Sequence, residues 1–233
     1  MDAADGADPL ATSWRPWPAR SRAKVVFLPG ERGAAERIAR RLFDRPLESW
    51  EYAGLAGAPD DARVEVGASA GKLYIEIGNP AAAYRGFFYL RRAKQHLVLL
   101  NDGFHISVAH LQRRGLGLYI VQRQVAAAAA LGIDRIEVLA GRRRHENGYY
   151  TWPRFGFEGR LPARLRRTLP IELQDAATLL DLMECETGRS WWRENGVSIG
   201  ARFDLAAGSR SRTALAQYVR SKMNLPKWPK NKS

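Results

Sequence analysis

The sequence predicts an α/β protein, in which α-helices pack on a mixed β-sheet. Three observations indicate this class. Short runs such as Arg63–Val66 and Lys72–Ile77 alternate charged and apolar residues with the period of a half-buried strand. The long alanine-rich run 118–131 has the broad apolar face of a packed helix. A glycine-rich turn precedes this run and a strand-like run, 133–139, follows it, as in layered α/β proteins.

The first part of the chain predicts an extended tail, then one strand and two helices. Residues 1–21 contain three prolines and show no periodicity, which is typical of an extended segment. Lys24–Leu28 is an apolar run closed by a Pro-Gly pair, so a strand and a turn are expected. Glu31–Phe43 predicts an amphipathic helix, and Leu47–Leu55 a second, short one. The apolar face expected on the first helix consists of Ala34, Ile38 and Leu42.

A meander of strands is expected next. The two alternating runs named above form a hairpin around a turn at residues 67–71. Arg85–Arg91 contains three consecutive aromatic residues and predicts a strand, and residues 96–107 predict another. Asn101-Asp102-Gly103 interrupts this last strand, since glycine inside a strand pattern often marks a bulge or a turn.

A glycine motif opens the central helix. It reads Gln112-Arg113-Arg114-Gly115-Leu116-Gly117, and the helix that follows ends before Gly132. The two glycines allow the backbone to fold closely around an anion. The first N–H groups of a helix lack partners within the helix and carry the positive end of its dipole, so a phosphate group bound there is stabilised.

The pattern Gln-x-x-Gly-x-Gly leading into a helix resembles the pyrophosphate-binding motif of the GNAT superfamily, the acyl-CoA-dependent N-acyltransferases. Gln112, Gly115 and Gly117 occupy the fixed positions of that motif. The flanking strands are in the order this family shows, and Phe155-Gly156-Phe157 stands where it has a Leu-Gly-Phe ending. The resemblance implies a GNAT-like core over residues 22–161. Residues 162–225 would then be a helical addition with the last sheet strand, and residues 226–233 a basic tail.

The resemblance also implies acetyl-CoA as the acyl donor. Backbone N–H groups of the glycine motif would bind the pyrophosphate, with the two arginines adding charge. The end of the strand before the motif would pair with the amides of the pantetheine arm. The residues expected to contact acetyl-CoA are therefore Ile106, Ser107, Val108, Gln112, Arg113, Arg114, Gly115, Leu116, Gly117 and Leu118.

Acyl transfer to an amine also needs a base and an acid. The family often uses a carboxylate on the meander or on the strand before the motif as the base; the candidates are Glu76, Asp102 and His105. Family members carry the acid, a tyrosine, four residues before the Gly of Gly-Phe, but here that position is Trp152, whose indole cannot serve. Tyr149 or Tyr150 would substitute. Pro153 requires that the helix carrying them be short or begin near residue 151.

The C-terminal third predicts a helical insertion, a strand and a terminal helix. Ile171–Glu184 and Gly188–Asn195 have helical patterns, and Ile199–Leu205 alternates like a strand. Ser211 is expected to cap the terminal helix, Arg212–Met223.

Composition limits the remaining possibilities. A chain of 233 residues with 45% hydrophobic residues can bury one substantial core. There is no apolar run of eighteen residues and no signal peptide, so we expect a cytoplasmic protein without a membrane partner. One cysteine, Cys185, excludes an internal disulfide, and the four histidines show no metal-ligand spacing, so no metal is expected.

The net charge of +13 indicates attraction to polyanions, or else an arginine-rich composition without a dedicated polyanionic partner. The function expected from the resemblance is N-acetyl transfer from acetyl-CoA to an unidentified small-molecule or peptide amine. The alternatives are a GNAT-fold binding module and an acyltransferase that acts on RNA; either would use the basic surface to contact nucleic acid, such as tRNA or the ribosome.

Overall fold

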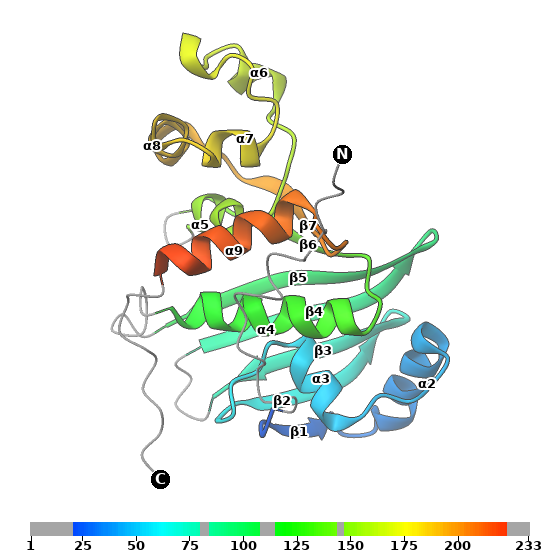
Figure 1. Cartoon of the computed structure of the whole chain (residues 1–233). Coiled ribbons are helices and arrows are strands. Elements are labelled where there is room, and N and C mark those ends of the chain that lie inside the picture. Colours follow the sequence, from blue (N-terminus) through cyan, green and yellow to red (C-terminus); the bar gives the residue numbers. More distant parts are fainter. Residues whose placement is uncertain (1–20, 80–83, 108–114, 144–146, 223–233) are drawn as a thin grey trace, which may run out of the picture. The chain divides into compact units, whose positions relative to one another are not determined.

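The computed structural model describes residues 21–79, 84–107, 115–143 and 147–222. It confirms the α/β class: helices accompany a mixed sheet whose seven strands follow one another in sequence order, β1 to β7 (Figure 1). The described residues up to Ile136 form one compact unit, and residues Glu137 to Ser221 form a second. The described part of the chain contains no helix long and apolar enough to cross a membrane.

The first unit is built on the predicted meander. A parallel pair joins β1 to β2, and antiparallel pairs join β2 to β3, β3 to β4 and β4 to β5. These strands are β1 (Lys24–Phe27), β2 (Arg63–Ser69), β3 (Lys72–Gly78), β4 (Tyr84–Ala93) and β5 (His96–Ile106). Their inward positions, among them Val64, Ile75, Phe88 and Leu90, are almost fully buried. Burial of these apolar side chains is what stabilises the sheet.

The turn between β2 and β3 is shorter than the sequence predicts. Gly67 lies inside β2, opposite Tyr74, and only Ala70 and Gly71 form the turn. Both turn residues have positive φ angles, 47° and 75°, as a two-residue hairpin turn requires. The prediction of a turn over residues 67–71 was therefore wrong in extent. The alternating pattern of the strand continues through Gly67, and a single glycine did not end it.

Three helices complete the first unit: α2 (Arg32–Phe43), α3 (Ser49–Leu55) and α4 (Leu116–Ala130). All three predicted helices are confirmed, and α4 begins two residues earlier than expected. The buried face of α2 is Ala35, Ala39 and Leu42, whereas Ala34 and Ile38 are half-buried. The small alanines therefore face the sheet, because they let the helix backbone approach it closely.

Helices α3 and α4 lie side by side against the sheet, and glycines set their spacing (Figure 1). A Cβ atom added at Gly54 would lie 2.8 Å from Ala127 Cβ, and one added at Gly57 only 2.2 Å from the carbonyl oxygen of Ile120. Gly57 also has a φ of 64°, which L-residues rarely adopt. Backbone at the end of α3 therefore contacts the backbone of α4 directly.

We expect Gly57→Ala to destabilise the protein more than Gly30→Ala. Gly30 also has a positive φ, 76°, but an added Cβ there would have no described atom within 4 Å. Backbone strain alone costs roughly 1 to 2 kcal/mol, so Gly30→Ala measures that cost. Gly57→Ala adds a clash of about 1 to 3 kcal/mol. Urea unfolding curves test this; equal losses for the two variants would mean that α3 and α4 tolerate a wider spacing.

A buried carboxylate holds the start of α3. Glu51 is 3% exposed, and its two carboxylate oxygens accept hydrogen bonds from the Arg45 guanidinium at 2.9 and 2.5 Å. The backbone N–H of Glu48 donates to the same carboxylate at 2.8 Å. The Arg45 hydrogen bonds hold the pKa of the Glu51 carboxyl below its ordinary value, although burial opposes this.

This ion pair predicts an acid dependence of stability. Because the folded-state pKa of Glu51 is lowered, its contribution is present above the ordinary carboxyl pKa and is lost as pH falls through the lower, folded-state value. We therefore expect Glu51→Gln to lose less stability than the wild type between pH 6 and pH 3. The control Glu36→Gln, in an exposed pair with Arg32, should retain the wild-type pH dependence. Identical pH profiles for Glu51→Gln and the wild type would contradict this role.

The second unit contains the predicted helical insertion, a strand and the terminal helix. Its elements are α5 (Gly148–Arg154), α6 (Ala163–Arg166), a 3-10 turn η2 (Ile171–Leu173), α7 (Leu179–Met183), α8 (Glu186–Asn195), β7 (Ile199–Asp204) and α9 (Arg210–Lys222). Strand β6 (Arg135–Ala140) begins in the first unit and ends in the second. Helix α5 is short, in agreement with the constraint from Pro153.

Two predictions in this unit were wrong. The single helix expected over residues 171–184 is divided into η2 and α7, because Thr178 starts a new helix by accepting a hydrogen bond from the N–H of Asp181. Ser211 does not cap α9. Its Oγ accepts from the N–H of Asp204 at 3.1 Å, while Ser209 Oγ accepts from the N–H of Arg212 at 3.3 Å. Ser209 is thus the capping residue, two positions earlier than expected.

The backbone conformation and the packing at position 156 both require glycine. Its φ is 92°, and an added Cβ would lie 2.2 Å from the carbonyl oxygen of Ser211. The glycine of the Phe-Gly-Phe sequence is therefore needed for close packing of the backbone against α9.

Candidate functional site

The described part of the glycine motif begins at Gly115, at the corner where α4 starts. Gly115 is the residue before the helix and has a left-handed conformation, with φ 89° and ψ 0°. An added Cβ at this position would have no described atom within 4 Å. The first hydrogen bond of the helix runs from Tyr119 N–H to Gly115 O, at 2.8 Å. The N–H groups of residues 116–118 precede that bond, so the helix itself gives them no acceptor.

The electrostatics of this corner favour an anion. No acidic residue lies in the first turn of α4, and the helix dipole is positive there. Gly117 is half-buried, and an added Cβ would lie 3.8 Å from the ring of Phe104 on β5, which is an ordinary contact distance. The end of β5 and the start of α4 therefore lie together.

Strand β5 contains the predicted bulge. Phe88 on β4 faces Asn101 and Phe87 faces Gly103, so Asp102 is the additional residue. Before the bulge, Asn101 is 5% exposed, and beyond it Phe104 faces Gly86. The bulge therefore keeps both of these side chains on the face of the sheet that carries α4. Without an additional residue, a strand of period two would place them on opposite faces.

Buried amides connect this bulge to both neighbouring helices. Asn101 Nδ2 donates to Gln124 Oε1 on α4 at 2.7 Å, and Gln124 Nε2 donates to the carbonyl oxygen of Leu55, at the end of α3, at 2.9 Å. Gln124 is completely buried. The Leu55 carbonyl can only accept, so it fixes the orientation of both amides. Asn101 Oδ1 is then buried without a hydrogen-bond partner among the described residues.

At its other end, away from the bulge, β5 is hydrogen-bonded to the residue just before β6. The N–H of Asp134 donates to Leu97 O at 3.0 Å, and the N–H of Leu97 donates to an Asp134 carboxylate oxygen at 2.6 Å. This last hydrogen bond, with help from His96, holds the pKa of Asp134 below its ordinary value. The start of β5 is therefore fixed to the chain just before β6, five residues before the bulge.

We expect Gln124→Leu to reduce stability by about 2 to 6 kcal/mol, because it leaves two buried polar groups, Leu55 O and Asn101 Nδ2, without partners at roughly 1 to 3 kcal/mol each. Gln122→Leu is the matched control: Gln122 is half-buried on the same helix, and its replacement should change stability by less than about 0.5 kcal/mol. Urea unfolding measures both. A loss for Gln124→Leu no larger than that of the control would show that the amides do not hold the bulge to the helices.

The predicted base candidates lie near each other on the meander but not in one cluster. Asp102 and His105 are both exposed. His105 pairs in register with Arg85 and shares its face of the sheet, away from α4. Glu76 accepts hydrogen bonds from Tyr74 and Arg85, so its carboxylate is already engaged. Asp102, the additional residue of the bulge, therefore directly follows Asn101, whose side chain lies on the α4 face. His105 lies on the opposite face.

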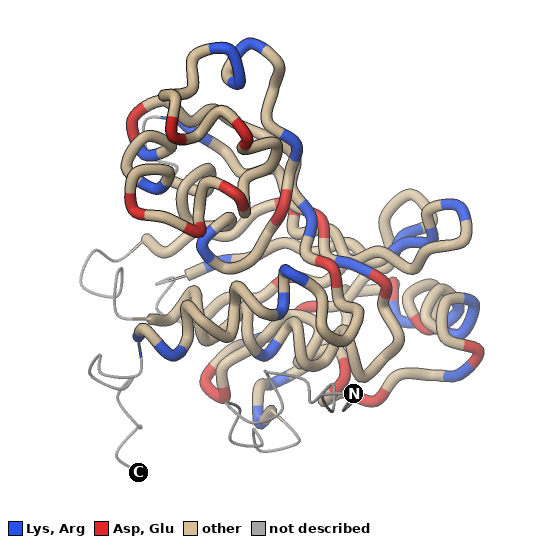
Figure 2. The backbone as a smooth tube through the Cα atoms, turned by 45° about the horizontal axis from the view of Figure 1, so that its top comes forward, with Lys and Arg blue, Asp and Glu red and all other residues tan. Residues whose placement is uncertain are grey.

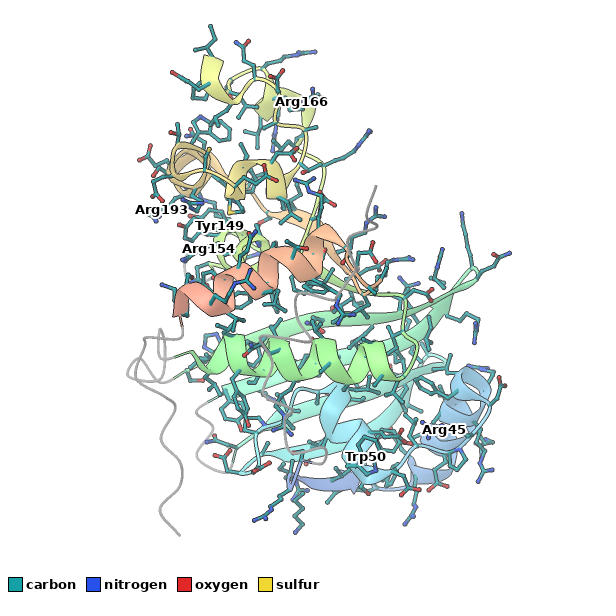
Figure 3. All side chains as sticks on the ribbon, in the orientation of Figure 1. Arg45, Trp50, Tyr149, Arg154, Arg166 and Arg193 are labelled. Atoms are coloured by element: carbon teal, nitrogen blue, oxygen red, sulfur yellow. The ribbon has the colours of Figure 1, made fainter. Side chains whose placement is uncertain are left out.

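The predicted acid candidates lie in the second unit, where both tyrosine hydroxyls contact Arg193 of α8. Figure 3 labels Tyr149, Arg154 and Arg193 in this region. Tyr149 donates to the carbonyl oxygen of Arg193 at 2.8 Å, and Tyr150 accepts from its guanidinium at 2.7 Å. Arg154 lies over the rings of both Tyr150 and Tyr218, 5.0 and 4.7 Å from their centroids. The structure therefore brings these tyrosines into a cluster of aromatic rings and guanidinium groups.

Several predicted ligand residues lie outside the described part of the chain: Val108, Gln112, Arg113 and Arg114. Ile106 ends β5, and Ser107 follows it and is exposed. In the described ranges no group of three or more His, Cys, Asp or Glu side chains could hold a metal ion. The corner is thus described by Gly115, Leu116, Gly117 and Leu118 together with the end of β5.

Sequence reasoning missed the buried polar residues of α4 and of the neighbouring strands β4 and β5. Besides Asn101 and Gln124, Arg123 of α4 is 6% exposed and donates to the Tyr119 hydroxyl at 2.9 Å. Tyr84, opposite Ile106, is 1% exposed, and burial raises the pKa of its hydroxyl, with the nearby Asp61 carboxylate adding to the effect. The only signal in the sequence for these residues was that two polar side chains, Arg123 and Gln124, lie on the apolar side of an alanine-rich helix.

In comparisons with known proteins, no family model and no curated protein matches the chain.

Proposed function

We propose that the chain is an acyl-CoA-dependent N-acyltransferase of the GNAT type, which transfers an acetyl group from acetyl-CoA to an amine. The observation that supports this most is the Gly115 corner: a left-handed glycine, whose added Cβ would have no described atom within 4 Å, begins a helix directly beside a bulged strand. Such a corner offers three N–H groups and a positive dipole to a pyrophosphate.

In this proposal the main chain binds the acyl donor. The N–H groups of Leu116, Gly117 and Leu118 would hold the pyrophosphate, and the main chain of Ile106 and Ser107 would pair with the amides of the pantetheine arm. The thioester of acetyl-CoA would supply an activated acyl group. The amide network of Asn101 and Gln124 supports this arrangement because it fixes the bulged strand to the helix that carries the phosphate-binding N–H groups.

Base catalysis in this proposal falls to the bulge. Asp102 is exposed at the bulge, where a carboxylate can accept the proton of an incoming amine directly or through water, and His105 is the second candidate base. Tyr149 and Tyr150 are candidates for the acid that protonates the departing thiolate. Tyr149 already donates its only hydroxyl proton to a carbonyl, so Tyr150, which accepts from Arg193, retains a proton to donate.

One observation favours the alternative of a binding module without catalysis. The usual tyrosine position is occupied by Trp152, whose ring packs edge-on against Phe157 at a centroid distance of 4.8 Å. This side chain therefore belongs to the aromatic core around α5. A thiol-release assay separates the two functions, since only an enzyme releases free CoA in the presence of acceptor.

We expect Gly117→Val to weaken coenzyme A binding at least tenfold, measured by calorimetry. The added Cβ is tolerated beside Phe104, but the branched side chain would cover the N–H groups of the first turn. Ala126→Val is the control, a β-branched replacement at a half-buried site farther along α4. Affinity within twofold of the wild type for Gly117→Val would remove the corner as the binding site.

The reaction is tested by thiol release from acetyl-CoA over amino-acid, polyamine, peptide and tRNA acceptors. An acyltransferase must release thiol with at least one acceptor class and lose that activity in Gly117→Val. Binding of coenzyme A without any acceptor-dependent release would favour the binding module. Binding of RNA that weakens steeply with salt would favour the basic-surface alternative.

A further inference from the structure

A loop in the second unit carries four exposed arginines. It runs from Arg160 to Thr178 and contains α6 and η2; we call it the arginine loop. A backbone bridge between Arg160 and Thr178 closes the loop at its base, where the N–H of Leu161 donates to the carbonyl oxygen of Ala177 at 2.9 Å. Figure 2 shows its basic residues as blue segments at the top of the view. The four exposed residues are Arg160, Arg164, Arg166 and Arg167.

The backbone that carries these arginines is fixed. The N–H groups of Leu165 and Arg166 donate to the carbonyl oxygen of Pro162 at 2.9 and 3.1 Å, and the Thr168 hydroxyl donates to the carbonyl oxygen of Leu165 at 2.9 Å. Four apolar side chains of the loop are at most 7% exposed: Leu161, Leu169, Leu173 and Ala176. The loop is therefore an ordered support, and its basic side chains are exposed on it.

The charge of the arginine loop is not used within the described chain. None of its four arginine side chains has a hydrogen bond or an ion pair with another described residue. Elsewhere in the same unit, Arg210 pairs with three carboxylates and Arg189 pairs with Glu186. The two carboxylates of the loop itself, Glu172 and Asp175, are exposed and form no such pair with its arginines. All N–H donors of four guanidinium groups thus remain for a ligand.

Two of these arginines line an open hollow of about 300 Å³. Its lining is Ala163, Arg166, Arg167 and Gln174, so α6 and the residue after η2 face the same space. The N–H of Gln174 donates to the carbonyl oxygen of Ile171 at 3.4 Å. Ile171 is 78% exposed, and of the other large apolar side chains in the described ranges only Leu139 is also exposed. The surface of the loop therefore combines guanidinium groups with one apolar side chain.

The dipole of α6 does not explain this charge. Basic residues in the last turn of a helix interact favourably with its dipole. Helix α6 has only four residues, however, and Arg160 lies outside it. Guanidinium groups match phosphate oxygens in pairs, so several of them on one ordered loop match a polymer that carries a phosphate at every unit.

Ile171 favours one class of such polymers. Unpaired bases expose apolar faces that a side chain can cover, whereas the bases of a duplex are stacked inside it. An anionic membrane gains affinity with the apolar area that it buries, and one isoleucine supplies little of that area. We propose that the arginine loop binds single-stranded nucleic acid, with its guanidinium groups on phosphates and Ile171 against a base. The proposal does not depend on the acyltransferase function.

The probe is a fluorescein-labelled 20-mer of oligouridine, titrated with the full chain at 50 to 300 mM salt and followed by fluorescence anisotropy. We expect the triple variant Arg164→Gln/Arg166→Gln/Arg167→Gln to bind at least tenfold more weakly at 50 mM salt. The slope of log K against log salt should become shallower by about 2, since each phosphate contact on a single strand contributes about 0.7.

The matched control for this triple variant is Arg22→Gln/Arg37→Gln/Arg40→Gln. It removes the same charge from three exposed arginines of the first unit, whose side chains also have no hydrogen bond or ion pair with a described residue. Its affinity should stay within twofold of the wild type, with the wild-type salt slope. Neither triple variant breaks a described side-chain contact, so both should fold, which thermal unfolding checks.

The apolar contact has its own test. Ile171→Ser should weaken binding about threefold without changing the salt slope, because it removes no charge. Leu139→Ser replaces the other exposed large apolar side chain of the described ranges and should leave binding unchanged. Equal effects of these two variants would remove Ile171 from the site and with it the preference for single strands.

Four further results would overturn the proposal. The first is absence of oligouridine binding at 50 mM salt. The second is an equal loss in the two triple variants, which would assign binding to net charge. The third is equal or tighter binding of an RNA duplex of the same length. The fourth is binding of phosphatidylserine vesicles that depends on the loop, without binding of oligouridine. Gly117→Val should retain oligouridine affinity, so this proposal and the acyl-donor site fail independently.

Discussion

The completely buried amide of Gln124 is the contact on which the arrangement of the first unit depends. It takes one hydrogen bond from the bulged strand and gives one to the end of α3, from a position in the middle of α4. Apolar packing alone would allow α4 to slide along the sheet by a fraction of a turn, because alanine surfaces are nearly uniform. Hydrogen bonds of fixed direction remove that freedom, since displacement would leave buried polar groups without partners.

The same hydrogen bonds explain why glycines are needed in α3 and directly after it. The Leu55 carbonyl reaches Gln124 only because the two helices approach closely, and Gly54 and Gly57 provide that approach. The additional residue at Asp102 then brings Asn101 and Phe104 onto the side that faces α4. A bulge, two glycines and one glutamine, distant in sequence, thus specify together where the first turn of α4 lies. The position of that turn decides where the first N–H groups of α4 lie.

Features that follow from local pattern were predictable from the sequence, and features that depend on distant partners were not. The period of two found the strands, and Gly103 inside a strand pattern marked the bulge. The position of the glycine motif before an alanine-rich run predicted the start of α4 to within two residues. The end of the β2–β3 hairpin was misplaced because Gly67 interrupts the pattern without breaking the strand. The buried role of Gln124 was missed because its partners, Leu55 and Asn101, are 69 and 23 residues away. Ser211 was misassigned for the same reason, since its oxygen serves Asp204 and not its own helix.

The anion site that we propose at the Gly115 corner relies on neutral groups of the backbone. The Gly115 corner has no acidic residue in its first turn and offers neutral N–H groups and a dipole, whose attraction is short-ranged. Recognition at the corner should therefore depend on the geometry of the backbone. The net charge of +13 does not explain such a site, because the N–H groups that would contact the anion are neutral.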